Sequence, residues 1–263
     1  MQWAMQPPGV APGEILLQYF SILLRRFGPQ RWWPARTRLE IIVGAILTQN
    51  TTWHNAALAL RKLRKAGRLS WKGLHRSSRR EVEACVKPAG FYRQKARAVR
   101  NFVVWLARTH GGSLNALFAL PPAEVRRQLL EVKGLGPETA DTILLYAGRQ
   151  AFFVADAYTR RVLARHGLLP ITANYAHAQS YLHKHLPADQ RMYNEFHALL
   201  VEVGKKHCQR DAAYCERCPL EEFLPSGGAL RALEGQGKSQ QKRPPLNPLL
   251  KEEGTKLWSL AEL

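Results

Sequence analysis

The sequence has no long apolar segment, few acidic residues and only four cysteines. No stretch approaches the roughly 20 consecutive apolar residues of a membrane-spanning helix. The first residues, MQWAMQPPGVAPGE, lack the basic-then-apolar order of a signal peptide. We therefore expect a cytoplasmic protein with no membrane partner, associated with the nucleoid if the source is bacterial. No internal repeat is evident.

The scarcity of acidic residues gives the chain a strong positive charge. Asp and Glu number 20 against 39 Lys and Arg, for a formal net charge of +19 over 263 residues. A basic surface favours a polyanionic partner such as DNA or RNA, although anionic membranes and acidic proteins use the same attraction. With a hydrophobic share of 46% the chain can also bury a substantial core. The composition predicts a globular protein of enzyme size that binds nucleic acid.

Strand-like alternation of apolar and polar residues is also absent, and helical spacing of apolar residues takes its place, which predicts an all-α fold. After Pro225 the sequence becomes rich in Gly, Ser, Gln and Pro, so 225–263 is expected to be a mostly disordered tail. Its six Lys/Arg nearly balance its four Glu, and the basic character therefore belongs to the body. Helices are expected at 13–27, at two places within 39–63 on either side of a polar break at 48–52, and at 79–86, 94–108, 121–132, 137–147, 156–166, 174–185 and 189–206.

Two of the expected helices are joined by the short turn Lys133-Gly134-Leu135-Gly136, with Pro137 in the first turn of the second helix. Two glycines allow positive φ and bring backbone N–H groups close to an outside anion. Leu135 is expected to fill the gap between the helices, and Lys133 to add charge. Such a turn can bind a DNA phosphate without reading base sequence. An ordinary glycine-capped helix connection is the alternative.

Asp156 follows an apolar lead-in and precedes a helical pattern in AFFVADAYTRRVLARHG. An aspartate at this position is a favourable N-cap. Capping is compatible with catalysis, because a carboxylate fixed at a helix start is also a positioned charge. Elsewhere, Cys208, Cys215 and Cys218 crowd together while Cys85 stands alone. In a reducing compartment this clustering indicates a metal or cluster site more than disulfides.

The order KGLGPETADTILLY followed by VADAYTRRVL resembles the helix-hairpin-helix glycosylase superfamily of endonuclease III, over roughly residues 14–224. WWP at 32–34, LTQNTTW at 47–53 and GFYRQKA at 90–96 are most similar to its 3-methyladenine DNA glycosylase III branch. The resemblance implies a monomer that acts on double-stranded DNA containing a damaged base, in a groove between two lobes. The lobes would comprise about 30–135, and 14–29 with 136–207, followed by a cysteine loop at 208–224.

The resemblance also implies roles for two carboxylates. Asp156 would act where the base leaves the sugar, because a carboxylate stabilises the oxocarbenium character that develops there and helps to orient water. Bifunctional members carry a lysine nucleophile where this chain has Glu138, and a carboxylate cannot form an imine. A monofunctional enzyme is therefore expected, with Glu138 in the first helical turn beside the base pocket. A bifunctional lyase, a non-catalytic DNA-binding module and an iron–sulfur sensor are the alternatives.

Base excision requires the damaged nucleotide to rotate out of the duplex into a pocket. Gln49 matches a residue that some relatives insert into the vacated space, although a buried amide at a helix junction is an equal alternative. Trp53, Trp33 and Trp32 match residues that line the base pocket. Two facing aromatic planes would favour a cationic alkylpurine, whereas tryptophans are more often core residues.

The three clustered cysteines reproduce the first positions of the family's C-x6-C-x2-C-x5-C loop, which holds a [4Fe–4S] cluster, but the fourth position is Leu224. A cluster with an unusual fourth ligand, a zinc site and a loop without metal remain open. Candidates for binding phosphates on the groove rim are Lys95, Arg97, Arg160 and Arg161.

Overall fold

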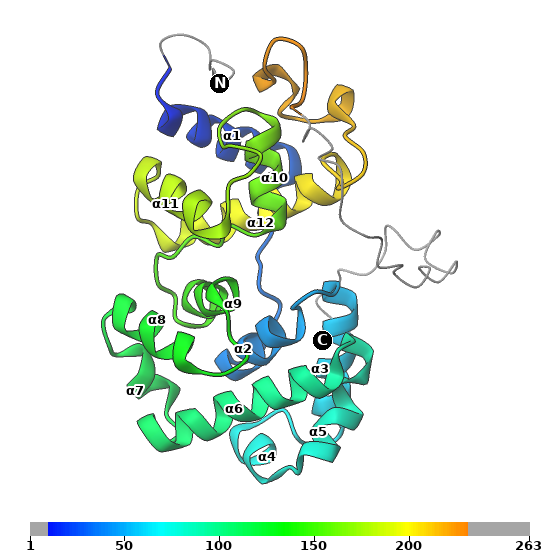
Figure 1. The fold of residues 1–263 in the computed structure, drawn as a ribbon, viewed down its shortest axis with the longest axis vertical. Coiled ribbons are helices and arrows are strands. Elements are labelled where there is room, and N and C mark those ends of the chain that lie inside the picture. Colours follow the sequence, from blue (N-terminus) through cyan, green and yellow to red (C-terminus); the bar gives the residue numbers. More distant parts are fainter. Residues whose placement is uncertain (1–9, 231–263) are drawn as a thin grey trace. The chain divides into compact units, whose positions relative to one another are not determined.

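The computed structural model describes residues 10–230, and these residues form helices and connecting loops without a strand (Figure 1). One isolated β-bridge joins Cys208 and Ala213. The all-α prediction is confirmed. Within the described range no helix is both long enough and apolar enough to cross a membrane. From residue 231 onward, the expected tail at 225–263 lies outside the described residues.

Every predicted helix is present with its ends within two residues of the expected positions, but 137–147 divides into an α-helix and a π-helical turn. The short helices α4 and α7 were not predicted. The α-helices are α1 (Pro12–Phe27), α2 (Arg38–Leu47), α3 (Trp53–Lys65), α4 (Trp71–Arg76), α5 (Arg79–Val86), α6 (Tyr92–His110), α7 (Leu114–Phe118), α8 (Pro122–Glu131), α9 (Pro137–Thr142), α10 (Ala157–Arg165), α11 (Tyr175–His185) and α12 (Gln190–Lys206). Single turns occur at η1 (Lys87–Ala89), η2 (Ile143–Ala147, π-helical), η3 (Cys215–Arg217) and η4 (Glu221–Phe223).

Eight of the twelve α-helices within residues 10–230 start at a side-chain cap, while α1, α8 and α9 start with a proline in the first turn. A Ser, Thr, Asn or Asp oxygen accepts a hydrogen bond from an otherwise unpaired amide of the first turn, which stabilises a helix by about 1 kcal/mol. The capping residues are Thr37, Thr52, Ser70, Ser78, Ser113, Asp156, Asn174 and Asp189. The predicted capping role of Asp156 is therefore observed.

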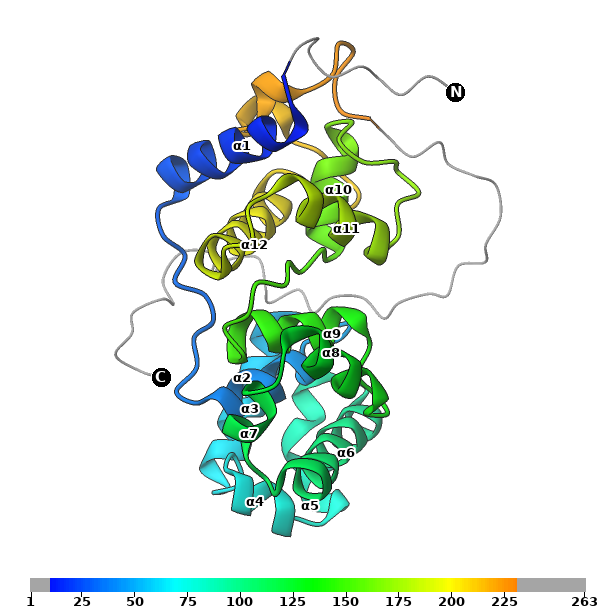
Figure 2. The same cartoon turned by 90° about the vertical axis from the view of Figure 1, so that its left-hand side faces the viewer.

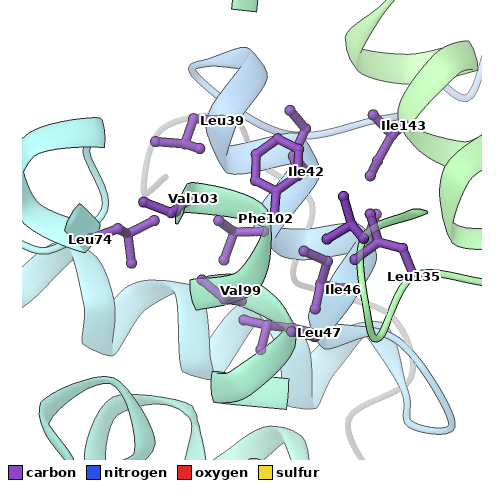
Figure 3. Close-up of a cluster of buried hydrophobic side chains, with 14 of the residues drawn as sticks. Leu39, Ile42, Ile46, Leu47, Leu74, Val99, Phe102, Val103, Leu135 and Ile143 are labelled. Atoms are coloured by element: carbon purple, nitrogen blue, oxygen red, sulfur yellow. The ribbon is translucent and has the colours of Figure 1, made fainter. Parts of the chain in front are cut away.

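Two hydrophobic clusters form the core. The first cluster contains side chains from all the helices from α2 through α9. Figure 3 shows Leu135 and Ile143 among its side chains. The second joins α1, α10, α11 and α12, which Figures 1 and 2 both show side by side. The expected division at residue 136 does not separate these clusters, because η2 contributes Ile143 to the first and Leu145 and Tyr146 to the second. This helical segment is buried on both sides and connects the two clusters.

A buried carboxylate on α9 ties several elements together. The side chain of Asp141 is completely buried and accepts two hydrogen bonds from Arg126 of α8, at 2.6 and 3.1 Å. Tyr175 Oη and Gln179 Nε2 of α11 each donate to its Oδ2 at 2.8 Å. Gln179 Nε2 also donates to the backbone oxygen of Phe153 at 2.8 Å. One carboxylate thus fixes both helices of the hairpin, α11 and the segment that leads to Asp156.

Replacing Asp141 with Ala should lower the free energy of unfolding by about 3–5 kcal/mol, because the substitution leaves the partly buried Arg126 charge and two polar groups without their partner. Urea denaturation followed by circular dichroism measures this loss. The matched control is Glu202→Ala, which removes the more exposed i,i+4 pair with Lys206 and should cost less than ~1 kcal/mol. Equal losses in the two variants would contradict the assigned importance of Asp141.

Candidate functional site

The hairpin turn requires glycine at one position and not at the other. Gly134 has a φ of 107°, and a Cβ there would lie 2.7 Å from the Cβ of Ala98. Gly136 instead has a φ of −96° and open space around it. The turn adopts the expected positive φ at Gly134 only, because Gly136 precedes Pro137, and a residue before proline is pushed to the extended region. Gly136 serves as the N-cap residue of α9.

Side-chain hydrogen bonds occupy two carbonyl oxygens of the hairpin turn, and two of its amides remain as exposed donors. Asn101 Nδ2 donates to the Lys133 carbonyl at 2.7 Å, and Gln49 Nε2 donates to the Gly134 carbonyl at 3.0 Å. The amides of Gly134 and Gly136, both exposed, have no acceptor within residues 10–230. With its acceptors satisfied and its donors free, the turn at the start of α9 has the chemistry of a phosphate site.

Gln49 and Phe91 line a groove along α6 and the hairpin. Gln49 Nε2 also donates to Thr139 Oγ1 at 2.9 Å, so the predicted alternative of a satisfied amide at a helix junction describes the free protein. Phe91 was not predicted from sequence. It is 65% exposed and has a φ of 45°, a conformation that is unusual for an aromatic residue. The groove therefore presents an amide and an apolar ring beside the hairpin.

The four candidate phosphate ligands have different surroundings. Lys95 is buried, its Nζ donates to the carbonyls of Leu47 and Ala89, and burial lowers its pKa to about 8. Lys95 lines the groove, but the carbonyls at the ends of two helical segments hold its ammonium inside the protein. Arg161 donates to the carbonyls of Gly204 in α12 and Cys208 in the loop, and it stacks over a tyrosine ring. Arg97 is exposed and lines the groove.

Asp156 is the N-cap of α10, and its Oδ1 accepts a hydrogen bond from the Thr159 amide at 2.8 Å. Its Oδ2 lies 3.6 Å from His197 Nε2 of α12, and its side chain remains 14% exposed. Burial disfavours the charged form, but the interactions with His197 and Thr159 outweigh it and lower the pKa of this carboxyl. The site therefore holds an ionised carboxylate with one oxygen free of a close hydrogen bond.

Glu138 lies in the first turn of α9 and is exposed at its surface, with only part of its surroundings formed by protein. Its pKa is raised, first because the surrounding protein displaces water and then because the charge of Asp156 repels a second negative charge. Arg160 and His197 partly offset this shift. Two carboxyls with pKa values displaced in opposite directions share this region, an arrangement typical of acid–base sites.

Tyr146 and His197 were not predicted as site residues. Tyr146 Oη lies 2.5 Å from His197 Nδ1, and both side chains are buried. The Tyr146 ring packs against Trp33 with centroids 5.3 Å apart. These two residues connect Trp33 to Asp156. Their contact spans 51 positions in sequence, so local sequence patterns contain no signal for it.

The structure brings the three predicted tryptophans together. Ring centroids of Trp53 lie 5.0 Å from both Trp32 and Trp33. Their planes cross at 71° and 84°, so the expected pair of facing planes is wrong for the free protein, in which the rings meet edge to face. Gly44 permits this packing, because a Cβ there would lie 3.2 Å from the Trp33 ring.

The cysteine loop closes around a small cavity lined by Cys208, Cys215, Cys218 and Leu224. Arg165 Nη1 donates to Cys208 Sγ at 3.3 Å. Among residues 10–230, no three His, Cys, Asp or Glu side chains lie close enough to share one metal ion. Three thiols with Leu224 at the fourth position do not fit a cluster that takes four thiolates.

The sequence matches the profile of the HhH-GPD superfamily of base excision DNA repair proteins over residues 43–188. It is 39% identical over 211 residues to a Methanocaldococcus jannaschii protein named as a DNA repair glycosylase, and the match covers 80% of this chain and 96% of that protein.

Solved structures show the same fold. H. pylori 3-methyladenine DNA glycosylase (MagIII) bound to 1,N6-ethenoadenine superposes with a TM-score of 0.65 and 26% identity, over 75% of this chain and 98% of that chain. A non-covalent endonuclease III–DNA complex superposes with a TM-score of 0.70 and 19% identity, over 82% and 96% of the respective chains.

Replacing Gly134 with Ala should lower the free energy of unfolding by about 1–3 kcal/mol, because the backbone stays in a strained conformation and the new Cβ meets Ala98. Gly136→Ala is the matched substitution in the same turn and should change stability little. Urea denaturation of both variants measures the difference, and a Gly136 variant as unstable as the Gly134 variant would contradict this account of the hairpin.

Proposed function

The chain belongs to the HhH-GPD superfamily of base excision DNA repair proteins, and we propose that it is a monofunctional N-glycosylase that removes alkylated purines from double-stranded DNA. Membership of this superfamily identifies the chain as a DNA glycosylase. The observation that carries the finer proposal is the ionised carboxylate of Asp156, which is close enough to Glu138 for their charges to interact and is connected to the aromatic cluster through His197 and Tyr146.

The chemistry follows from the two displaced carboxyls. As the bond between base and sugar breaks, positive charge develops on the deoxyribose, and the free Oδ2 of Asp156 can stabilise it and orient a water molecule. Glu138 holds its proton more readily than an ordinary glutamate because its pKa is raised. It can therefore donate a hydrogen bond to the departing base.

The lysines near the groove support a glycosylase without a lyase step. Glu138 occupies the position of the nucleophile in bifunctional relatives. Lys95 is engaged by two carbonyls inside the protein. Lys133 is an exposed residue of the turn. A Schiff-base mechanism requires a free amine beside Asp156. Glu138 has no amine, the amine of Lys95 is engaged, and Lys133 lies in the exposed turn.

The substrate class is supported by the tryptophan cluster and by the H. pylori relative. A cationic alkylpurine gains stacking and cation–π attraction from indole rings. Trp32 and Trp53 touch in the free protein, so a base can enter between them only after these rings separate. Trp33 then lies between the bound base and Tyr146, which contacts the His197 ring next to Asp156.

Duplexes with alkylated, deaminated, oxidised or mismatched bases provide the main test. The wild-type protein should release alkylpurines, leave strands that break only after alkali, and form no adduct with borohydride. Asp156→Asn should slow release by about 10²-fold or more, because a neutral amide does not stabilise the developing cation. Release of only oxidised or mismatched bases, or a trapped adduct, would contradict the proposal.

The base pocket can be tested separately. Trp53→Ala should reduce kcat/KM for an alkylpurine by about tenfold or more, because a base loses roughly 1–3 kcal/mol when an aromatic stacking partner is removed. Trp105→Phe is the control, since Trp105 packs against Phe102 and His110 on α6. Unchanged kcat/KM in the Trp53 variant would exclude this residue from the pocket.

We further propose that the cysteine loop holds its structure without an iron–sulfur cluster, through Arg165, which also donates to the carbonyls of Gln209 and Arg210. Anaerobically purified protein should contain iron and sulfide only at background level and lack visible absorption. Cys215→Ser should leave base release unchanged. Close to four irons per chain would contradict this proposal.

A further inference from the structure

A line of contacts leads from the aromatic cluster to the candidate catalytic carboxylate. Trp33 packs on Tyr146, Tyr146 Oη is hydrogen-bonded to His197 Nδ1 at 2.5 Å, and His197 Nε2 lies 3.6 Å from Asp156 Oδ2. Within residues 10–230, His197 Nε2 is buried and has no hydrogen-bond partner at normal distance. A buried donor that faces only a slightly distant carboxylate is incompletely satisfied. This pattern points to function more than to packing.

We propose that His197 is a positioning residue of the glycosylase reaction: anchored by Tyr146, it directs Nε2 at Asp156 Oδ2 and thereby sets the orientation and the acid sensitivity of the catalytic carboxylate. This inference rests on the proposed role of Asp156. It adds a residue on α12 and a residue on η2 to a site otherwise built from the hairpin and the start of α10.

The hydrogen bond to Tyr146 determines how His197 acts. The Tyr146 hydroxyl has two acceptors within reach, His197 Nδ1 at 2.5 Å and the Asn194 carbonyl at 3.5 Å. When it donates to the nearer one, Nδ1, the neutral imidazole carries its proton on Nε2, the nitrogen that faces Asp156. A small movement of the carboxylate toward the imidazole, from 3.6 Å to normal hydrogen-bond distance, would complete this contact. His197 therefore holds a donor ready for the carboxylate while leaving Oδ2 able to face the sugar.

The other charged and titratable groups around Asp156 come from three elements. Glu138 of α9 lies close enough for their charges to interact, and so does Tyr158 of α10. Arg160 of α10 acts on Glu138, and Glu195 of α12 acts on Tyr146. Of the side chains that lower the pKa of Asp156, His197 contributes most. Removing His197 should therefore raise that pKa.

A second tyrosine–histidine pair supplies a matched control. Tyr19 Oη lies 2.8 Å from His166 Nδ1, and both residues are buried, as in the pair at the site. Tyr19 belongs to α1, and neither Asp156 nor Glu138 contributes to the shift of its pKa. Tyr19→Phe and Tyr146→Phe thus remove the same kind of hydrogen bond, but only the second is connected to the catalytic carboxylate.

The first experiment measures single-turnover base release as a function of pH for the wild type, His197→Gln, Tyr146→Phe and Tyr19→Phe. In His197→Gln, the acidic limb of the pH–rate profile should move up by about one pH unit, because the Asp156 carboxylate becomes protonated at a higher pH. The plateau should fall about tenfold. Tyr146→Phe should move the limb in the same direction by less, and Tyr19→Phe should not move it. A lower plateau with an unmoved limb in both site variants would overturn the proposal.

The second experiment needs no substrate. The full chain contains four aspartates, so carboxyl ¹³C labelling of aspartate allows each to be titrated by NMR, with Asp156→Asn providing the assignment. The midpoint of Asp156 should rise in His197→Gln and in Tyr146→Phe but not in Tyr19→Phe. An unchanged midpoint in a folded site variant would overturn the proposal. If the wild type released no alkylpurine, the proposed substrate would be wrong, yet this titration would still decide the role of His197.

Discussion

The buried carboxylate of Asp141 is the constraint on which the arrangement of the site depends. A carboxylate taken out of water is costly unless its charge and lone pairs are matched. Asp141 is matched by Arg126 on α8 and by Tyr175 and Gln179 on α11. Because these donors come from different elements, none of the elements can shift without leaving a buried charge poorly paired. The hairpin is thereby held against α11.

The same network determines where the catalytic carboxylate lies. Gln179 bonds both Asp141 and the backbone of Phe153, three residues before Asp156 in the chain. On the other side of Asp141, the π-helical turn η2 brings Tyr146 to His197 and Trp33. The hairpin that presents amides to DNA and the loop that presents a carboxylate to the sugar therefore share one buried anchor. A displacement of the hairpin is therefore expected to displace the loop, and the reverse, because both are hydrogen-bonded through Asp141 and Gln179.

Local chemistry explains which parts of the site could be predicted from sequence. The helix positions, the turn at Gly134 and the capping role of Asp156 are set by a few neighbouring residues, so helical spacing, glycine, proline and caps were sufficient. The burial of the Lys95 ammonium could not be predicted, because it depends on carbonyls at Leu47 and Ala89, and the first of these is distant in sequence. Tyr146 and His197 could not be found, because their pairing arises only when η2 and α12 pack together.

Asp141 and Asp156 differ in a way that separates a structural from a catalytic carboxylate. Asp141 has no exposed side-chain surface, and four hydrogen bonds satisfy its two oxygens. Asp156 is 14% exposed, accepts one close hydrogen bond from Thr159, and has its other oxygen 3.6 Å from His197. A saturated carboxylate has nothing left to offer a substrate, whereas a partly satisfied one keeps lone pairs for a developing positive charge. The incomplete pairing that makes Asp156 a poor anchor is what suits it to the reaction, and Asp141 provides the rigidity that Asp156 lacks.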